Sequence, residues 1–111
     1  NVVIPDSVIY IGKQAFYRNN NLTKVTISDD VKVIGDYCFM GDFRLEEVNI
    51  NESSNLEIIG EYAFESCYSL KRLILPFNLK SISFNSLMLI TPLLTTSNLL
   101  LFFQSTTDQP I

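Results

Sequence analysis

The sequence predicts an α/β repeat solenoid with one parallel β-sheet and short helical or 3₁₀ segments on its convex side. First, a six-residue pattern that begins with isoleucine occurs at Ile11, Ile34 and Ile59 and, in decayed form, at Ile82. The intervals are 23, 25 and 23 residues, which is typical of stacked supersecondary units. Second, a short alternating apolar segment follows each of the first three copies. Third, a phenylalanine recurs at one position of the pattern.

Each full repeat contains one predicted strand. The segments 22–27, 45–50 and 70–75 read LTKVTI, LEEVNI and LKRLIL, and apolar residues occupy alternate positions at the end of each. Such alternation indicates a short, half-buried strand. Successive units are related by a small translation, and each connection is long enough for a parallel return. We therefore expect parallel strands near Val25, Val48 and Leu73.

The segment that connects the strands is predicted to fill the convex half of the core. Phe16, Phe39 and Phe64 share one register, each behind a small residue, which indicates a stacked column of buried rings. Tyr37 and Tyr62 also share a position, so we expect partly buried rings along the stack. A glycine opens the segment, where a positive φ or a close backbone approach favours a residue without Cβ. These glycines are Gly12, Gly35 and Gly60.

The repeated motifs resemble a known family. The combination of LxxVxI, LPxxL and IGxxAFxxC at a 23-residue period is similar to the BspA-type, or Treponema pallidum-type, leucine-rich repeat of bacterial and protist surface proteins. The resemblance covers residues 2 to about 82. Two departures stand out. The cysteine of the motif survives only as Cys67, with Asn19 and Asp42 at the equivalent places, and residues 51–57 (NESSNLE) hold two extra residues.

This resemblance implies a leucine-rich-repeat arc and a non-enzymatic binding module. Family members are adhesive, partner-binding surface antigens with no catalytic residues to carry over. We therefore expect part of a cell-surface or secreted adhesin-like protein that contacts a protein or another macromolecule. Two alternatives stay open, an intracellular, cytoplasmic scaffold or signalling protein and a purely structural spacer.

The predicted contact surface is the concave face of the sheet. It is formed by outward residues, namely Lys24, Thr26, Ser28, Glu47, Asn49, Asn51, Arg72 and Ile74. Lys24, Glu47 and Arg72 share one register, so strands about 4.8 Å apart would present a positive, negative, positive row. For stability we expect this row to neutralise itself, since an exposed ion pair contributes about 0–1 kcal/mol. The face remains the predicted contact surface because solenoids bind there.

Composition excludes several functions. The net charge is −4 and the basic residues are dispersed, so the sequence predicts no binding to nucleic acid. The chain contains no histidine and no motif for phosphate, calcium or nucleophile chemistry, so we expect no enzyme activity, cofactor or metal site. Asp29, Asp30, Asp36 and Asp42 are taken as acidic residues of corners and turns. Cys38 and Cys67 occupy non-equivalent positions, which predicts buried free thiols rather than a disulfide.

The two ends are predicted to differ from the repeats. Residues 1–87 form the repeat region, and residues 88–111 form a degenerate apolar tail that is disordered, a makeshift cap or not native in frame. The apolar stretch 82–103 is long enough to span a bilayer, but Pro92 and the polar run after it argue against this. At the other end the chain begins within a repeat, so we interpret it as a fragment.

Exposed repeat ends favour self-association. We expect the apolar residues of the first turn to be bare, namely Val2, Ile4, Val8 and Ile11. Residues 51–55 should bulge outward to absorb the two extra residues. Asn21 and Asn51 fit the glycosylation acceptor pattern, which matters only in a secreted eukaryotic protein.

Overall fold

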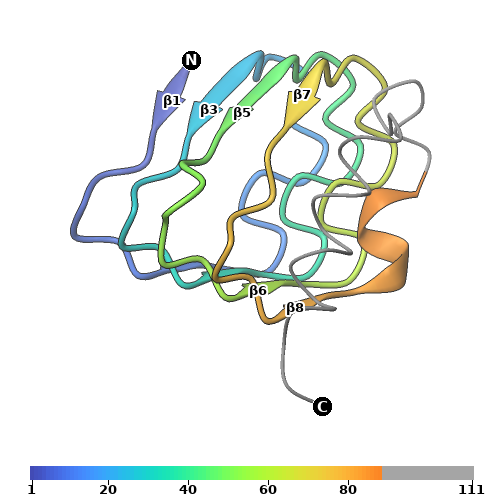
Figure 1. Cartoon of the computed structure of the whole chain (residues 1–111). Helices are drawn as coiled ribbons and strands as arrows, with labels where there is room; N and C mark the ends of the chain where they lie inside the picture. Colours follow the sequence, from blue (N-terminus) through green and yellow to red (C-terminus); the bar gives the residue numbers. More distant parts are fainter. Residues whose placement is uncertain (89–111) are drawn as a thin grey trace.

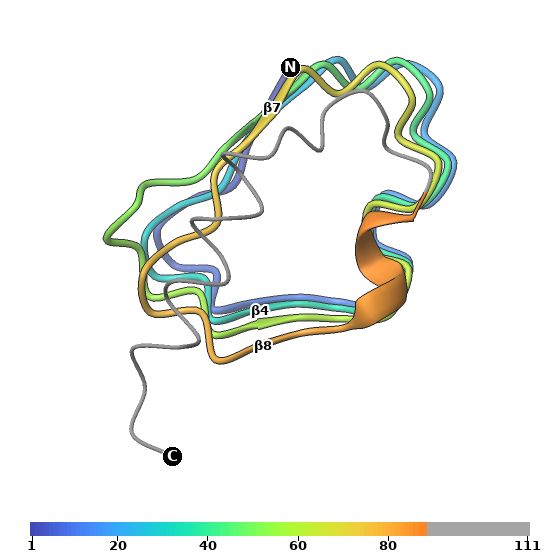
Figure 2. The same ribbon diagram turned by 45° about the vertical axis from the view of Figure 1, so that its right-hand side comes forward.

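The computed structural model describes residues 1–88, which form a parallel β-solenoid of about four turns. Seen along the stack, the successive turns superimpose on one another (Figure 2). Each of the first three turns runs through a strand of one sheet, a corner, a strand of a second sheet and a long connecting segment. The fold is therefore the predicted repeat solenoid, with the differences described below.

The first sheet contains the three strands that the sequence predicts and a further strand, β1, at its edge. Its members are β1 (Val2–Val3), β3 (Lys24–Thr26), β5 (Glu47–Asn49) and β7 (Arg72–Leu73), in that order (Figure 1). All pairs are parallel, and Val25 pairs with Val48, which pairs with Leu73. Each of these three residues is buried and lies between more exposed neighbours. The predicted alternation of buried and outward side chains is confirmed.

A second parallel sheet corrects the prediction of one sheet. It contains β2 (Tyr10–Ile11), β4 (Val33–Ile34), β6 (Ile58–Ile59) and β8 (Ser81–Ile82). Each strand has two residues, one facing outward and the next inward, so the repeat isoleucines belong to strands. Two residues are too short for a visible period, which explains why the pattern did not reveal them.

The connecting segments contain less helix than predicted. Within residues 1–88 the helical element is η1 (Phe84–Leu87), a 3₁₀ helix in the last turn. The first three connections are instead turns with left-handed residues at matched positions. Gln14, Tyr37 and Tyr62 have φ of 60°, 59° and 56°. The label α/β is therefore wrong, because the ordered turns consist of short strands and tight turns.

Gly35 and Gly60 are required for close approach and not for a positive φ. A Cβ at Gly35 would lie 2.7 Å from the backbone nitrogen of Lys13, and one at Gly60 would lie 2.6 Å from that of Asp36. Neither distance is tolerated between real atoms. Gly12, in the first turn, meets no such contact, since its nearest neighbour is a Tyr10 side-chain atom at 3.8 Å.

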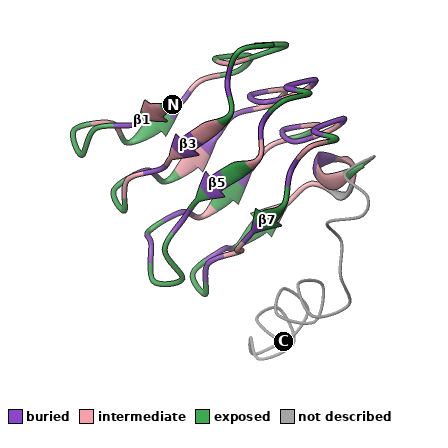
Figure 3. Ribbon diagram, turned by 90° about the horizontal axis from the view of Figure 1, so that it is seen from above, coloured by how far each residue is buried: buried purple, intermediate pink, exposed green. Residues whose placement is uncertain are grey.

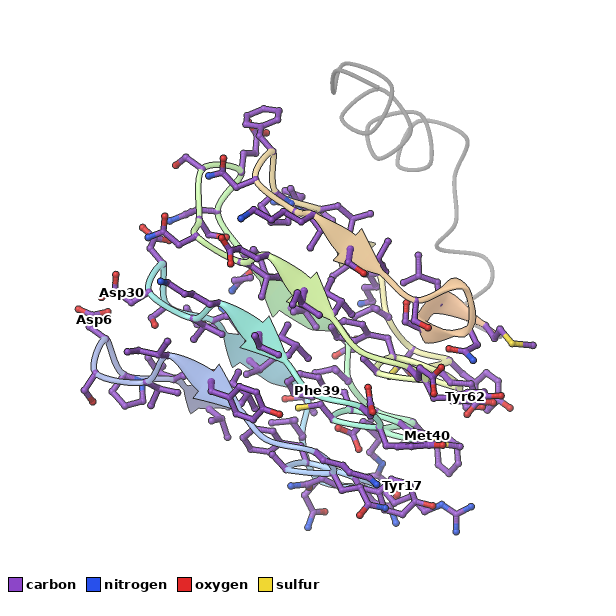
Figure 4. The ribbon with its side chains drawn as sticks, turned by 90° about the horizontal axis from the view of Figure 1, so that it is seen from below. Asp6, Tyr17, Asp30, Phe39, Met40 and Tyr62 are labelled. Carbon is purple, nitrogen blue, oxygen red and sulfur yellow. The ribbon has the colours of Figure 1, made fainter. Side chains whose placement is uncertain are left out.

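The core contains the predicted column of phenylalanines. Phe39 and Phe64 are fully buried and Phe16 is half-buried, with ring centroids 5.3 Å apart at both steps. Tyr37 and Tyr62 form a second stack at 5.4 Å and are half-buried, as predicted. Figure 3 marks where buried residues occur along each turn, and Figure 4 labels Phe39 within the stack.

The first turn is covered better than expected. Ile4 and Ile11 are 8% and 4% exposed, and Val2 and Val8 are half-buried. Their side chains point into the stack, where they pack against the core cluster, so the prediction that all four are bare is wrong. Outward residues such as Val3 and Tyr10 are the exposed ones. Self-association through this end stays a prediction, and the expectations for the tail after residue 88 lie outside the described residues.

The corner at residues 51–55 takes up the extra length of the middle unit. Figure 2 shows it projecting beyond the corresponding corners of the other turns, as predicted. The strand registers on both sides survive, with Val48 opposite Leu73 and Ile34 opposite Ile59. Asp6 and Asp30 lie in the corners of the first two turns. Figure 4 places them at one end of the turns and Tyr17, Met40 and Tyr62 at the other.

Candidate functional site

The outward side of the first sheet gathers the predicted contact residues. We call it the first-sheet face and define it by the eight residues predicted above. Within the sheet, Lys24 lies opposite Glu47 and Glu47 lies opposite Arg72, while Thr26 lies opposite Asn49. All eight are exposed or half-buried. The predicted surface is therefore contiguous across three turns.

The charged row of this face is half neutralised. The Lys24 Nζ atom lies 3.7 Å from Glu47 Oε2, with both side chains about half exposed. A long, exposed pair of this kind contributes about 0–1 kcal/mol. Arg72 takes part in no ion pair among the described residues. The row thus stabilises the fold little and leaves one cation available.

The polar residues beside the charged row make two long hydrogen bonds and one short one to the preceding turn. The Asn49 Nδ2 group donates to Thr26 Oγ1 across 3.5 Å, and the Ser28 hydroxyl donates to the Pro5 carbonyl across 3.3 Å. Asn51 Nδ2 donates to Asp29 Oδ1 across 2.9 Å. An amide carries two donors and one acceptor, so one bond leaves capacity for a ligand.

A groove of about 870 Å³ lies over this face and is open to solvent. Six of the eight predicted residues line it, namely Thr26, Glu47, Asn49, Asn51, Arg72 and Ile74. Lys24 and Ser28 lie outside it. Polar groups on a shallow open floor suit contact with an extended macromolecule better than enclosure of a small molecule.

The sequence analysis missed the wall of the groove. Glu52 and Ser53 of the extended corner line it together with Lys71 and Phe77. The Phe77 N–H donates to the Glu52 carbonyl across 2.8 Å, which joins the two corners that form the wall. Phe77 is 59% exposed and stands where the other copies have Asp6 and Asp29. That exchange of an aspartate for an aromatic residue is the signal that could have identified it.

Asp42 is buried in the core, which corrects its assignment to an ordinary turn. Its side chain is 0% exposed, one carboxyl oxygen accepts the Asn19 N–H across 2.6 Å, and Oδ2 has no hydrogen-bond partner among the described residues. Burial raises the pKa of this carboxyl from 3.8 to about 7, against the opposing effect of the Asn19 N–H. Asp42 therefore lies away from the first-sheet face and affects stability.

The two cysteines are buried free thiols, as predicted. The Cys67 Sγ–H donates to the Phe39 carbonyl across 3.1 Å. Burial raises the pKa of both thiols to about 12, and the Asp42 carboxylate acts in the same direction. Because the thiolate is the reactive form, neither group is a nucleophile at neutral pH.

Residues 1–88 contain no helix that is long and apolar enough to cross a membrane. In the same part of the chain, no three His, Cys, Asp or Glu side chains are grouped so that they could hold a metal ion.

The sequence and the fold of this chain resemble those of known proteins. The sequence profile of the BspA-type leucine-rich repeat region matches residues 1–99 in six copies. The chain belongs to this family. BspA-type repeats are typically non-catalytic. No match is found among curated proteins.

Solved structures of leucine-rich repeat proteins share the fold. A leucine-rich repeat protein from Bacteroides ovatus is 34% identical over 73% of this chain, with a TM-score of 0.67. A leucine-rich cell surface protein from Faecalibacterium prausnitzii is 29% identical over 65%, with a TM-score of 0.57. A Treponema pallidum leucine-rich repeat protein is 23% identical over 82%, with a TM-score of 0.59, and supports the fold alone. The chain spans 23%, 22% and 55% of the lengths of these proteins.

Proposed function

We propose that this BspA-type chain is a non-enzymatic binding module of a surface or secreted protein, and that it contacts a macromolecular partner through the first-sheet face. The observation that carries the proposal is the groove over that face, which six of the eight predicted residues line. These residues hold one another weakly and are at least partly exposed. Their polar groups are therefore available to a partner.

A second, smaller groove of about 620 Å³ lies beside the second sheet, where Lys32, Glu57 and Lys80 line it. A similar charged row of Lys32, Glu57 and Lys80 lies directly before the strands of the second sheet, but Lys80 and Glu57 form a close ion pair, with Lys80 Nζ 2.9 Å from Glu57 Oε2. That hydrogen bond lowers the pKa of Glu57. The similarity to the Faecalibacterium prausnitzii cell surface protein supports the surface location.

A matched pair of triple variants tests the proposal. The chain is measured by biolayer interferometry against immobilised matrix proteins, glycoproteins and polysaccharides, and any partner is then measured with both variants. Replacement of Lys24, Glu47 and Arg72 by alanine is expected to weaken binding about tenfold or more, which corresponds to about 1.4 kcal/mol. The same replacement of Lys32, Glu57 and Lys80 beside the second sheet is the control and should leave binding unchanged.

Two results would count against the proposal. One is equal loss of binding in both triple variants, which would place the contact elsewhere or reveal a general loss of structure. The other is failure of the whole panel to bind. Thermal unfolding of both variants separates a lost contact from a lost fold, because surface substitutions of this kind change stability by about 0.5 kcal/mol or less.

A further inference from the structure

Arg72 is the charged residue that the first-sheet face leaves unpaired. Ion pairs within 4.0 Å among the described residues join Lys24 to Glu47, Lys71 to Glu46 and Lys80 to Glu57. Glu47 lies opposite Arg72 in the sheet, but its carboxylate is paired with Lys24. A guanidinium presents a planar fork of donors that matches one carboxylate. The free side chain of Arg72 therefore favours a carboxylate supplied by a partner.

Two amide side chains continue the groove beside Arg72. Asn49 and Asn51 are both exposed and line the groove. They are two residues apart, so their backbones are about 6.6 Å apart where the chain is extended. An extended ligand repeats its outward backbone amides with the same period of two residues. The two asparagines can therefore bond successive equivalent amides of a polypeptide that runs along the groove.

An apolar surface lies toward the other end of the groove. Ile74 is half-buried, and Phe77 is 59% exposed beside the extended corner. A large exposed aromatic ring within a polar groove is typical of a binding anchor. Arg72 and Phe77 are five residues apart, so their backbones are separated by at most about 18 Å. An extended ligand covers about 10–18 Å with three to five residues.

We propose that the groove binds an extended peptide segment in which one carboxylate and one aromatic side chain are separated by roughly three to five positions. The carboxylate pairs with Arg72, the peptide backbone bonds to Asn49 and Asn51, and the aromatic ring packs on Phe77. This assignment rests on the proposed function, because it names the partner chemistry of the same face.

The charges of the groove favour a peptide over an acidic polysaccharide. Glu47 and Glu52 line the groove close to the path of the ligand. A polymer with a carboxylate in every repeating unit would place further negative charges near both glutamates, and like charges disfavour binding. A segment with a single carboxylate at Arg72 avoids this repulsion.

Fluorescence anisotropy with the full chain tests the spacing and the roles. The probes are labelled peptides in which Asp and Phe are separated by one to seven threonines. Affinity is expected to be highest at the intermediate spacings. Arg72→Gln and Phe77→Ser should each weaken the best peptide about tenfold. Replacement of the peptide Asp by Asn should cost wild type the same factor and Arg72→Gln nothing further, which makes a double-mutant cycle.

Arg44→Gln is the matched control, since Arg44 is exposed, forms no ion pair among the described residues and lines neither groove, and it should bind as wild type does. Equal affinity at all spacings, or equal loss in the control, would overturn the inference. So would tighter Arg72-dependent binding of oligogalacturonate, which would assign the groove to acidic glycans. If no peptide binds while the panel partner still depends on the first-sheet face, this inference fails and the proposed function stands.

Discussion

Two columns of side chains run along the same connecting segment of the stack, and they differ in uniformity. One column is Phe16, Phe39 and Phe64, whose neighbouring rings are stacked and nearly parallel, with interplanar angles of 2° and 7°. The other column stands three residues later and contains Asn19, Asp42 and Cys67. The first is the same in the first three turns, whereas the second changes from an exposed amide to a buried carboxyl to a buried thiol.

The difference shows what stacking requires of a residue. In a solenoid the neighbour of each side chain is the equivalent side chain of the next turn, so a uniform column must be compatible with itself. Hydrocarbon rings meet this condition without partners. A buried polar group instead needs its own hydrogen bonds. Cys67 has one in the Phe39 carbonyl, while one oxygen of Asp42 has none in the described chain.

The largest expected effect comes from the centre of the phenylalanine column. Phe39→Ala should lower the free energy of unfolding by about 3–5 kcal/mol, because it opens a cavity between two stacked neighbours. Chemical denaturation measures the loss, and Phe39→Leu, which keeps more of the volume, should lose about 1 kcal/mol. A loss below about 1 kcal/mol for the alanine variant would mean that the column does not form the core.

The end of the same column should matter less. Phe16 is half-buried and has a ring on one side, so Phe16→Ala should lose about 2 kcal/mol, roughly half the effect at Phe39. The same denaturation experiment compares the two variants. Equal losses at both positions would contradict the view that each ring gains stability from both neighbours.

The protein should become more stable when the buried aspartate of the second column is replaced by the residue of the third turn, cysteine. Asp42→Cys is expected to raise the free energy of unfolding at pH 8 by about 1–2 kcal/mol, because it removes a buried, half-satisfied carboxylate. In the unfolded chain the pKa of Asp42 is 3.8, and in the folded chain it is raised to about 7. Folding therefore binds a proton between these values, and the contribution of Asp42 to stability falls as the pH rises from about 4 to 7.

The gain of the variant should accordingly shrink as the pH is lowered from 8 to 5, where wild-type Asp42 is protonated. Urea denaturation at several pH values measures this difference. Asp42→Asn is the control, since it removes the charge and keeps the shape, and it should abolish the pH-dependent part. A gain that does not vary with pH would show that the Asp42 carboxyl does not titrate in this range.

The smallest effect is expected at Cys67. Cys67→Ala removes one sulfur atom and a hydrogen bond to the Phe39 carbonyl, and should lose about 1 kcal/mol. Thermal or chemical unfolding at neutral pH measures it. A loss as large as that of Phe39→Ala would make the second column as important to the core as the first.

The sequence predicted the features that large apolar side chains repeat at fixed spacing. The register of Phe39 with Phe64 and that of Val25 with Val48 follow from the spacing alone, and both are found. The second sheet was missed because strands of two residues contain too little pattern. The left-handed backbone at Tyr37 and Tyr62 was also missed, since bulky residues rarely adopt it and nothing local in the sequence announces it.

The strand residues that form the floor of the groove could be predicted from the sequence, whereas the corner residues that form its wall could not. Outward residues such as Asn49 and Arg72 follow from the alternation of the strands. Phe77 and Glu52 reach the groove through corners whose path the repeat does not specify. The burial of Asp42 was hidden because an acidic residue near a turn is ordinary. Its equivalence to Cys67 was the available signal.

The extended corner at residues 51–55 also shows that a repeat can be lengthened without a change in the strand pairing. Two additional residues enter there, yet the strands before and after it keep their partners. An insertion at this place therefore changes the surface beside the groove without disturbing the stack. Sequence variation at such corners can diversify what a repeat protein recognises while its scaffold is inherited unchanged. The same property makes residues 51–55 a natural position for grafting new binding loops.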